Sequence, residues 1–207
     1  MERKEELERL DKETNDLLFS NVFSLSYYKN TEIYAIIQEY QYVFTNNLEQ
    51  ETGINGFYSA KDNSIYLDPK CLSKHLLLHE KMHMISASLK DQCLGYQDNR
   101  TKESFAFFNY LNESATEWLT CRVLHGENFL FDPESKIMLS YLPGVVAFQK
   151  YVNQFGEQRM LEHYFDHSPR KFWDALSTEE KMNLFTDFEE ARKKDVGLKK
   201  EKGEKGK

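Results

Sequence analysis

The chain has 207 residues, of which 40% are hydrophobic and 14% aromatic, so it can form one compact domain and is too apolar for a disordered chain. Its 34 acidic residues outnumber its 27 basic ones, which gives a formal net charge of -7 and argues against general DNA or RNA binding. Apolar runs of only a few residues argue against a membrane span, which needs roughly 20. We therefore expect neither nucleic acid nor membrane as a partner.

The start of the chain and its cysteines favour a cytoplasmic protein. Residues 2–18 are rich in charge and lack the apolar run of a secretory signal. Cys71, Cys93 and Cys121 are an odd number without C-x-x-C spacing, which is typical of reduced thiols rather than of disulfides or zinc ribbons. We expect all three cysteines to be core thiols.

The first third of the chain predicts two helices and a hairpin. Residues 2–19 carry leucines at helical spacing among Glu and Lys, which is typical of an amphipathic surface helix. A core helix is predicted from about residue 32 to residue 51, because apolar side chains recur at helical spacing up to Gly53. Between residues 54 and 67, two short apolar segments flank turn-prone residues, which predicts a hairpin.

The remainder of the chain predicts helices. Residues 73–89 are apolar nearly all round a helix, so this helix is expected to be buried. Further helices are predicted at 103–124, at 143–155 and from Ser177 to about Lys194, the last begun by a capping box. The low counts of 9 Gly and 4 Pro agree with a mainly helical protein.

The buried helix at 73–89 contains His79-Glu80-Lys81-Met82-His83, an H-E-x-x-H motif. Positions i and i+4 share one helix face, so both imidazoles can reach one zinc ion at about 2.0–2.1 Å. Glu80 is offset by one residue, which places its carboxylate beside the metal as a general base. With six His in the chain, chance produces the motif only about 0.02 times. The alternative is a pair of core histidines bonded to carboxylates without a metal.

A third metal ligand is expected from the helix at 103–124. Glu113 and Glu117 lie one turn apart on this otherwise apolar helix, where two buried carboxylates are costly without a cation. We interpret Glu113 as the third ligand and Glu117 as the carboxylate that accepts a hydrogen bond from a ligand imidazole. One Zn²⁺ per chain is the expected cofactor. His75, four residues before the motif, is interpreted as a helix-surface residue.

The motif His79 to His83, followed by Asn-Glu-Ser-Ala-Thr-Glu at 112–117, resembles the gluzincin zinc metallopeptidases. Their pattern is H-E-x-x-H followed by a helical N-E-x-x-x-D/E. The resemblance covers about residues 56–121. It implies that His79, His83 and Glu113 bind zinc, that Glu80 is the general base and that Glu117 is the outer carboxylate.

The same resemblance implies a substrate-binding strand and an oxyanion stabiliser. In zincins an edge strand before the motif helix pairs with an extended peptide, and Ile65, Tyr66 and Leu67 would be that strand. The family also supplies a His or Tyr from its C-terminal lobe to stabilise the oxyanion. The best place for it is a cluster in the C-terminal part of the chain, with two other candidates nearer to the motif. The cluster comprises His163, Tyr164 and His167, and the other two are His125 and Tyr110.

The expected fold is α+β and zincin-like, with a small, mostly antiparallel sheet and the active-site helix, followed by a predominantly helical C-terminal lobe. We expect a single domain over residues 1–195, with an N-terminal lobe of about 1–90 and a C-terminal lobe of about 91–195. Residues 196–207 are rich in Lys and Glu with almost nothing to bury, which predicts a disordered tail.

The function that we expect is zinc-dependent hydrolysis of a peptide or protein substrate. One alternative is a non-catalytic zincin-fold protein with a regulatory or partner-binding role, favoured by the unusual Lys81-Met82 pair and by the lack of a clear oxyanion residue. Another is a zinc hydrolase that acts on a non-peptide amide. The sequence does not indicate the oligomeric state, or whether the N-terminal helix covers the cleft.

Overall fold

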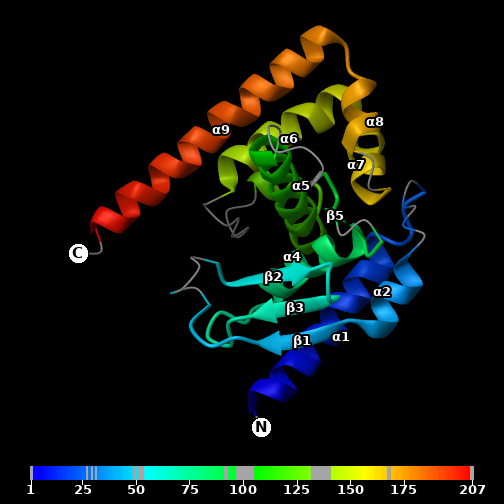
Figure 1. Ribbon diagram of the computed structural model, residues 1–207, viewed down its shortest axis with the longest axis vertical. Coiled ribbons are helices and arrows are strands. Elements are labelled where there is room, and N and C mark those ends of the chain that lie inside the picture. The colour runs from blue at the N-terminus through cyan, green and yellow to red at the C-terminus, as the bar shows by residue number, and fades with distance from the viewer. Residues whose placement is uncertain are drawn as a thin grey trace.

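The computed structural model describes residues 2–26, 28, 30, 32–48, 50, 54–90, 93–96, 105–131, 141–166 and 169–205. It is an α+β structure in which helices predominate and a small sheet lies beside α1, α2 and α4 (Figure 1). The elements are α1 (Glu2–Asn21), α2 (Ile33–Glu39), β1 (Gln41–Phe44), β2 (Gly56–Ser59), β3 (Ser64–Leu67), α4 (Lys74–Ile85), β4 (Ala87–Ser88), β5 (Cys93–Leu94), α5 (Phe105–His125), a 3-10 turn (Phe129–Phe131), α6 (Leu142–Phe155), α7 (Glu157–Phe165), α8 (Pro169–Asp174) and α9 (Thr178–Lys205).

Most of the predicted elements are confirmed. The N-terminal helix, the hairpin of β2 and β3, and the helices α4, α5, α6 and α9 all form close to their predicted positions. The last helix was expected to end near Lys194, whereas α9 continues to Lys205. None of the described helices has the length and the apolar character that a membrane span requires.

The predicted core helix over residues 32–51 is wrong in its second half. Helix α2 ends at Glu39, the backbone becomes extended at Tyr40, and residues 41–44 form strand β1. The sequence of β1 is Gln-Tyr-Val-Phe, and aromatic and β-branched side chains favour a pleated strand. A partner strand decides the outcome, because β1 pairs in parallel with β3 along its whole length.

The order of the three-stranded sheet is β1-β3-β2, with β3 antiparallel to β2. The sheet is therefore mixed, and the expectation of a mostly antiparallel sheet is wrong. The prediction that Ile65, Tyr66 and Leu67 form an edge strand is also wrong, because β3 is the central strand and is paired on both sides. The edge strand beside the motif helix is β2, which packs against α4.

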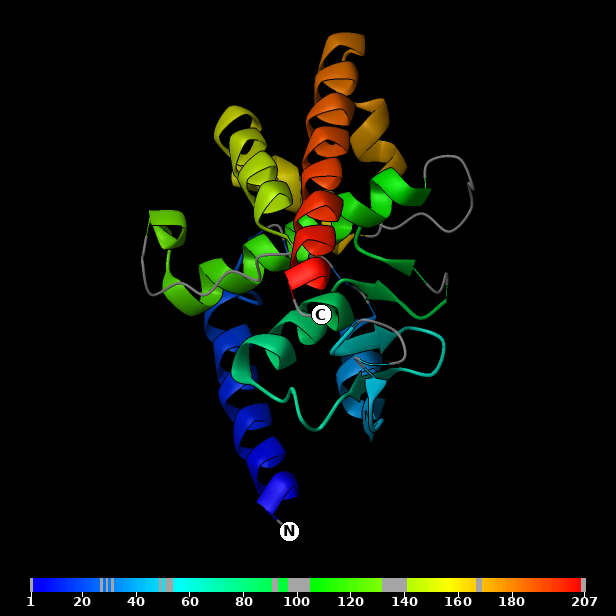
Figure 2. The same ribbon diagram turned by 90° about the vertical axis from the view of Figure 1, so that its left-hand side faces the viewer.

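Helix α1 packs along α4, on which the H-E-x-x-H motif lies (Figure 2). Its leucines enter the core, and a buried polar contact joins the two helices. The ammonium group of Lys81, which is 0% exposed, donates to Asp11 Oδ1 and to Asn15 Oδ1, both at 2.6 Å. The third position of the motif therefore anchors α4 to α1.

The helical half is built around α5, which packs against both α4 and α6. Helix α6 begins with a proline in its first turn and approaches α5 closely at Gly144. A Cβ atom at Gly144 would lie only 2.1 Å from the Ser114 hydroxyl oxygen, so a larger residue here would push the helices apart. Helix α9 packs across α5 and α6.

Candidate metal centre

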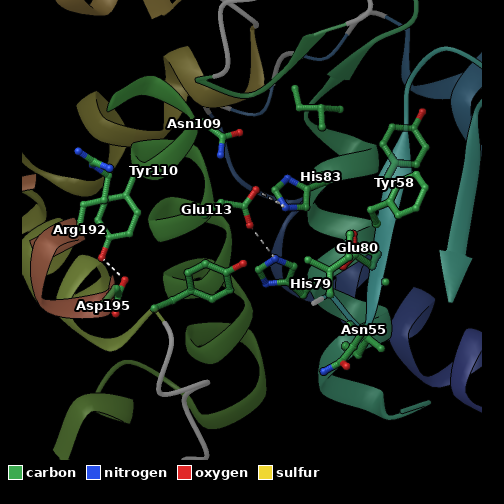
Figure 3. A pocket seen from close by; sticks show the side chains of 16 residues that line it. Asn55, Tyr58, His79, Glu80, His83, Asn109, Tyr110, Glu113, Arg192 and Asp195 are labelled. Carbon is green, nitrogen blue, oxygen red and sulfur yellow. Dashed lines mark hydrogen bonds and ion pairs between the residues drawn. The ribbon is translucent and has the colours of Figure 1, made fainter. Parts of the chain in front are cut away.

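The motif helix α4 and the long helix α5 bring three potential metal ligands together. Ser73 caps α4 by accepting a hydrogen bond from the Leu76 N–H, and the helix is buried from Leu76 to its end at Ile85. His79 and His83 project from one face of α4, and Glu113 points at both imidazoles from α5 (Figure 3). The structure thus brings together the three residues that the sequence proposed as metal ligands.

The distances within this group fit a shared metal ion. His79 Nε2 lies 3.5 Å from Glu113 Oε2, and His83 Nε2 lies 3.4 Å from Glu113 Oε1. These distances exceed the 2.7–3.2 Å of ordinary N–H···O hydrogen bonds. Two ligand atoms that bind one tetrahedral zinc ion at 2.0–2.1 Å lie about 3.4 Å apart. Two imidazoles and one carboxylate are also the protein ligands of many catalytic zinc sites.

The remaining nitrogens of both histidines are held by side chains of α5. His79 Nδ1 lies 2.9 Å from Glu117 Oε2, as the sequence predicted for Glu117. His83 Nδ1 has two contacts that the sequence did not predict, to Asn112 and to Thr116, each at 3.3 Å. The Glu117 carboxylate and the Thr116 hydroxyl can each accept an Nδ1 proton and leave both Nε2 atoms toward Glu113, which is how outer carboxylates and hydroxyls position metal-ligating imidazoles.

The charges at this site favour a cation beside Glu113. Burial alone would raise the pKa of Glu113. The charge and hydrogen-bonding capacity of the His83 and His79 imidazoles have the larger effect and hold this pKa well below its ordinary value. Burial would lower the pKa of His79, but Glu113 and Glu117 raise it well above its ordinary value. Positive charge is therefore stable here, carried either by an imidazolium or by a metal ion.

Glu80 lies beside the two imidazoles and faces the same cavity. Burial raises the pKa of Glu80 above its ordinary value, although His79 and His83 oppose this shift. The backbone of Tyr58 in β2 has a smaller effect, which also lowers this pKa. A positioned carboxylate of raised pKa suits proton transfer near neutral pH better than an exposed one.

A cavity of about 600 Å³ opens over the centre, within the size range of small-ligand pockets. Figure 3 shows Tyr58 and Glu80 on one side of it, with Tyr110, Arg192 and Asp195 on the other. No residue of α1 is among those that line it. For the described part of the chain, α1 therefore lies against α4 rather than over the cavity.

The structure does not support the predicted oxyanion cluster. Tyr164 is fully buried behind His83, where its hydroxyl lies 2.8 Å from that of Thr116. His163 is paired with Glu162 at 3.5 Å and does not line the cavity. His167 lies outside the described residues. Helix α7 presents Tyr164 to Thr116 of α5, so Tyr164 lies behind the His83 imidazole instead of facing a substrate.

The two alternative candidates fare differently. Tyr110 lines the cavity, but its hydroxyl donates to Asp195 on α9. His125 is the last residue of α5 and is not among the cavity-lining residues. Neither side chain therefore has a donor directed at the metal ligands.

Tyr141 is the cavity residue that sequence reasoning missed. Its ring lies nearly parallel to that of His79, with centroids 5.9 Å apart and an interplanar angle of 15°. The charge of Glu113 and burial together raise the pKa of Tyr141 well above its ordinary value. It stays protonated and can donate a hydrogen bond. Its position just before α6 carries no motif, so only the tertiary structure identifies it.

His75 also differs from its interpretation as a surface residue. Its side chain is 17% exposed, and its Nε2 lies 3.0 Å and 3.1 Å from the two oxygens of Glu117. The carboxylate of Glu117, which is 0% exposed, is thus held between His75 and His79.

Comparison with protein-family models, curated proteins and solved structures finds no match to the chain. The resemblance to gluzincins therefore rests on the two motifs and on the side chains that they bring together. Cofactor and activity follow from this geometry as proposals.

Proposed function

We propose that the protein is a zinc-dependent peptidase of zincin-like fold. The observation that carries this proposal is the group of His79, His83 and Glu113, whose nitrogen–oxygen distances of 3.4–3.5 Å match those of ligands around one zinc ion. A general-base candidate, Glu80, lies beside this group in the same cavity. Buried histidines without a metal would be expected to hydrogen-bond the carboxylate directly.

The residues of the chain have separable tasks in this mechanism. His79, His83 and Glu113 would hold zinc, which supplies a Lewis acid that polarises a carbonyl and makes water more acidic. Glu80 would take the proton of the attacking water and pass it to the leaving amine. The Tyr141 hydroxyl would donate a hydrogen bond to the carbonyl oxygen as negative charge develops there.

The edge strand β2 is the proposed docking site for an extended peptide. Residues 54–58 line the cavity, and β2 pairs only with β3 in the described sheet. Because the Asp68 N–H donates to the Asn55 C=O at 2.9 Å, Asn55 and Asp68 are a hydrogen-bonded pair. The alternation of an antiparallel strand then turns the N–H and C=O of Gly56 and Tyr58 away from β3. A peptide added at this edge would pass beside Glu80.

Two features that favoured a non-catalytic protein are compatible with catalysis in this fold. Lys81 points away from the cavity and is bound by Asp11 and Asn15 of α1. Tyr141 provides the donor that the sequence did not identify. A peptide substrate is proposed over another amide because β2 offers backbone groups of the kind that extended peptides pair with.

The test is Glu80→Gln, compared with Glu190→Gln on the exposed face of α9. Cleavage of an unfolded protein and a peptide library is followed by mass spectrometry, with and without EDTA. We expect EDTA to abolish cleavage, Glu80→Gln to lower it by about 100-fold or more without loss of zinc, and Glu190→Gln to leave it unchanged. Full activity in Glu80→Gln, or no EDTA-sensitive cleavage by the wild type, would contradict the proposal.

A further inference from the structure

A second cluster of potential metal ligands lies one helical turn away from the first. It consists of His75 on α4 with Glu117 and Cys121 on α5, and its ligand atoms all lie within 4.8 Å of one another. Each of its residues is offset by whole helical turns from the first centre. His75 lies four residues before His79, and Glu117 and Cys121 lie four and eight residues after Glu113.

The two oxygens of Glu117 both contact His75 Nε2, at 3.0 Å and 3.1 Å, but differ in their other partners. Oε2 lies 2.9 Å from His79 Nδ1 and so supports the first centre. Oε1 lies 3.0 Å from His75 Nε2 and 3.6 Å from the Cys121 sulfur. One carboxylate oxygen therefore converges with an imidazole and a thiol that the first centre does not use.

The surroundings of this cluster suit a bound ion. Glu117 and Cys121 are fully buried, whereas the His75 side chain is 17% exposed, so the cluster is accessible from the His75 side. Without a metal, the Cys121 thiol donates its proton to Glu117 Oε1, and an ion that binds there would release this proton to solvent.

We propose that His75, Glu117 and Cys121 form a second zinc-binding site, which shares Glu117 with the first centre. Imidazole, carboxylate and thiolate together are a donor set that zinc accepts. Zinc ligands of nitrogen and oxygen lie about 3.4 Å apart, so His75 has to withdraw from Glu117 by a few tenths of an ångström. His75 is the second residue of α4 and is partly exposed, which makes this movement feasible.

The experiment is a cobalt(II) titration of the full chain under reducing conditions, followed by absorption spectroscopy. Cobalt(II) replaces zinc at many sites, and a thiolate ligand adds an intense charge-transfer band in the near ultraviolet. The ligands of the first centre include no thiol, so this band reports only on a cysteine. We expect two cobalt ions per chain, with the band appearing in full and vanishing in Cys121→Ser. The matched control, Cys71→Ser, should keep the band.

Two further variants separate this site from the first centre. His75→Ala should lose the band and one of the two ions, and circular dichroism shows whether it folds. His83→Ala should lose the other ion and keep the band, because His83 contacts only the first centre. The second site would be overturned by binding of only one cobalt ion per chain without the charge-transfer band, or by a band that survives in Cys121→Ser. The contacts of His75 and Cys121 would then serve only to hold Glu117. Neither result bears on cleavage by Glu80.

Discussion

Removal of Asp11 should destabilise the fold far more than removal of an exposed acidic residue on the same helix. Asp11 accepts hydrogen bonds from Lys81 at 2.6 Å, from Tyr40 at 2.8 Å and from Tyr42. Asp11→Ala leaves the ammonium group of Lys81, which is 0% exposed, without its carboxylate partner. Breaking a buried pair in this way costs about 3–5 kcal/mol. Because Asp11 is itself 26% exposed, we expect the low end, about 3 kcal/mol.

Urea denaturation followed by circular dichroism measures this loss, with Glu13→Ala as the matched control. Glu13 is also on α1 and also lies 2.6 Å from its partner, Arg9, but both side chains are exposed. We expect Glu13→Ala to cost at most about 1 kcal/mol. The double variant Asp11→Leu with Lys81→Met removes both charges and should recover most of the loss. Equal losses for Asp11→Ala and Glu13→Ala would show that the buried ammonium group of Lys81 does not depend on Asp11.

The same pair predicts a pH dependence. Burial raises the pKa of Asp11, but hydrogen bonds from Lys81 and Tyr42 outweigh it and hold the pKa below its ordinary value of 3.8. A carboxylate whose folded-state pKa is lowered stabilises the fold above its unfolded-state pKa and loses this effect as the pH falls. The difference between wild type and Asp11→Ala should therefore shrink below about pH 4.

Three other substitutions test separate parts of the structure. Gly144→Ala places a methyl group against Ser114 and should lower the free energy of unfolding in urea by about 1–3 kcal/mol. Val146→Ala, on the exposed side of α6, should lower it by about 0.5 kcal/mol, and equal losses would contradict the close helix contact. Glu117→Gln should weaken zinc binding about 10–100-fold in a chelator competition, and unchanged affinity would contradict its role in orienting His79. Tyr141→Phe should lower kcat about 100-fold or more with unchanged zinc content, and an unchanged kcat would remove Tyr141 from the mechanism.

The grouping of His79, His83 and Glu113 was predictable from the positions of these residues on two helices. His79 and His83 share a helix face by their four-residue spacing alone, and Glu113 was found because a carboxylate stands out on an apolar helix. The same argument placed Glu117 correctly against His79. These predictions needed only that two helices pack against each other, which their apolar composition already requires.

The errors concern contacts between segments that are distant in sequence. Residues 41–44 form β1 only because β3 offers a partner, and the central position of β3 follows from that same pairing. Tyr164 was expected at the cavity and Tyr141 was missed, because only the packing of α6 and α7 decides which tyrosine faces the cavity. Lys81 seemed unusual for the motif because its partner, Asp11, lies 70 residues earlier.

The most direct test of the central claim is the zinc content of purified protein, measured by mass spectrometry. The protein should carry Cys121→Ser, so that only the first centre is counted, and should be purified without a metal-affinity column. We predict one zinc ion per chain, lost when His83→Ala or Glu113→Ala is added, in variants that circular dichroism shows to be folded. No bound zinc, even after zinc is supplied, would mean that His79 and His83 are satisfied by carboxylates alone, and the proposed peptidase would be contradicted.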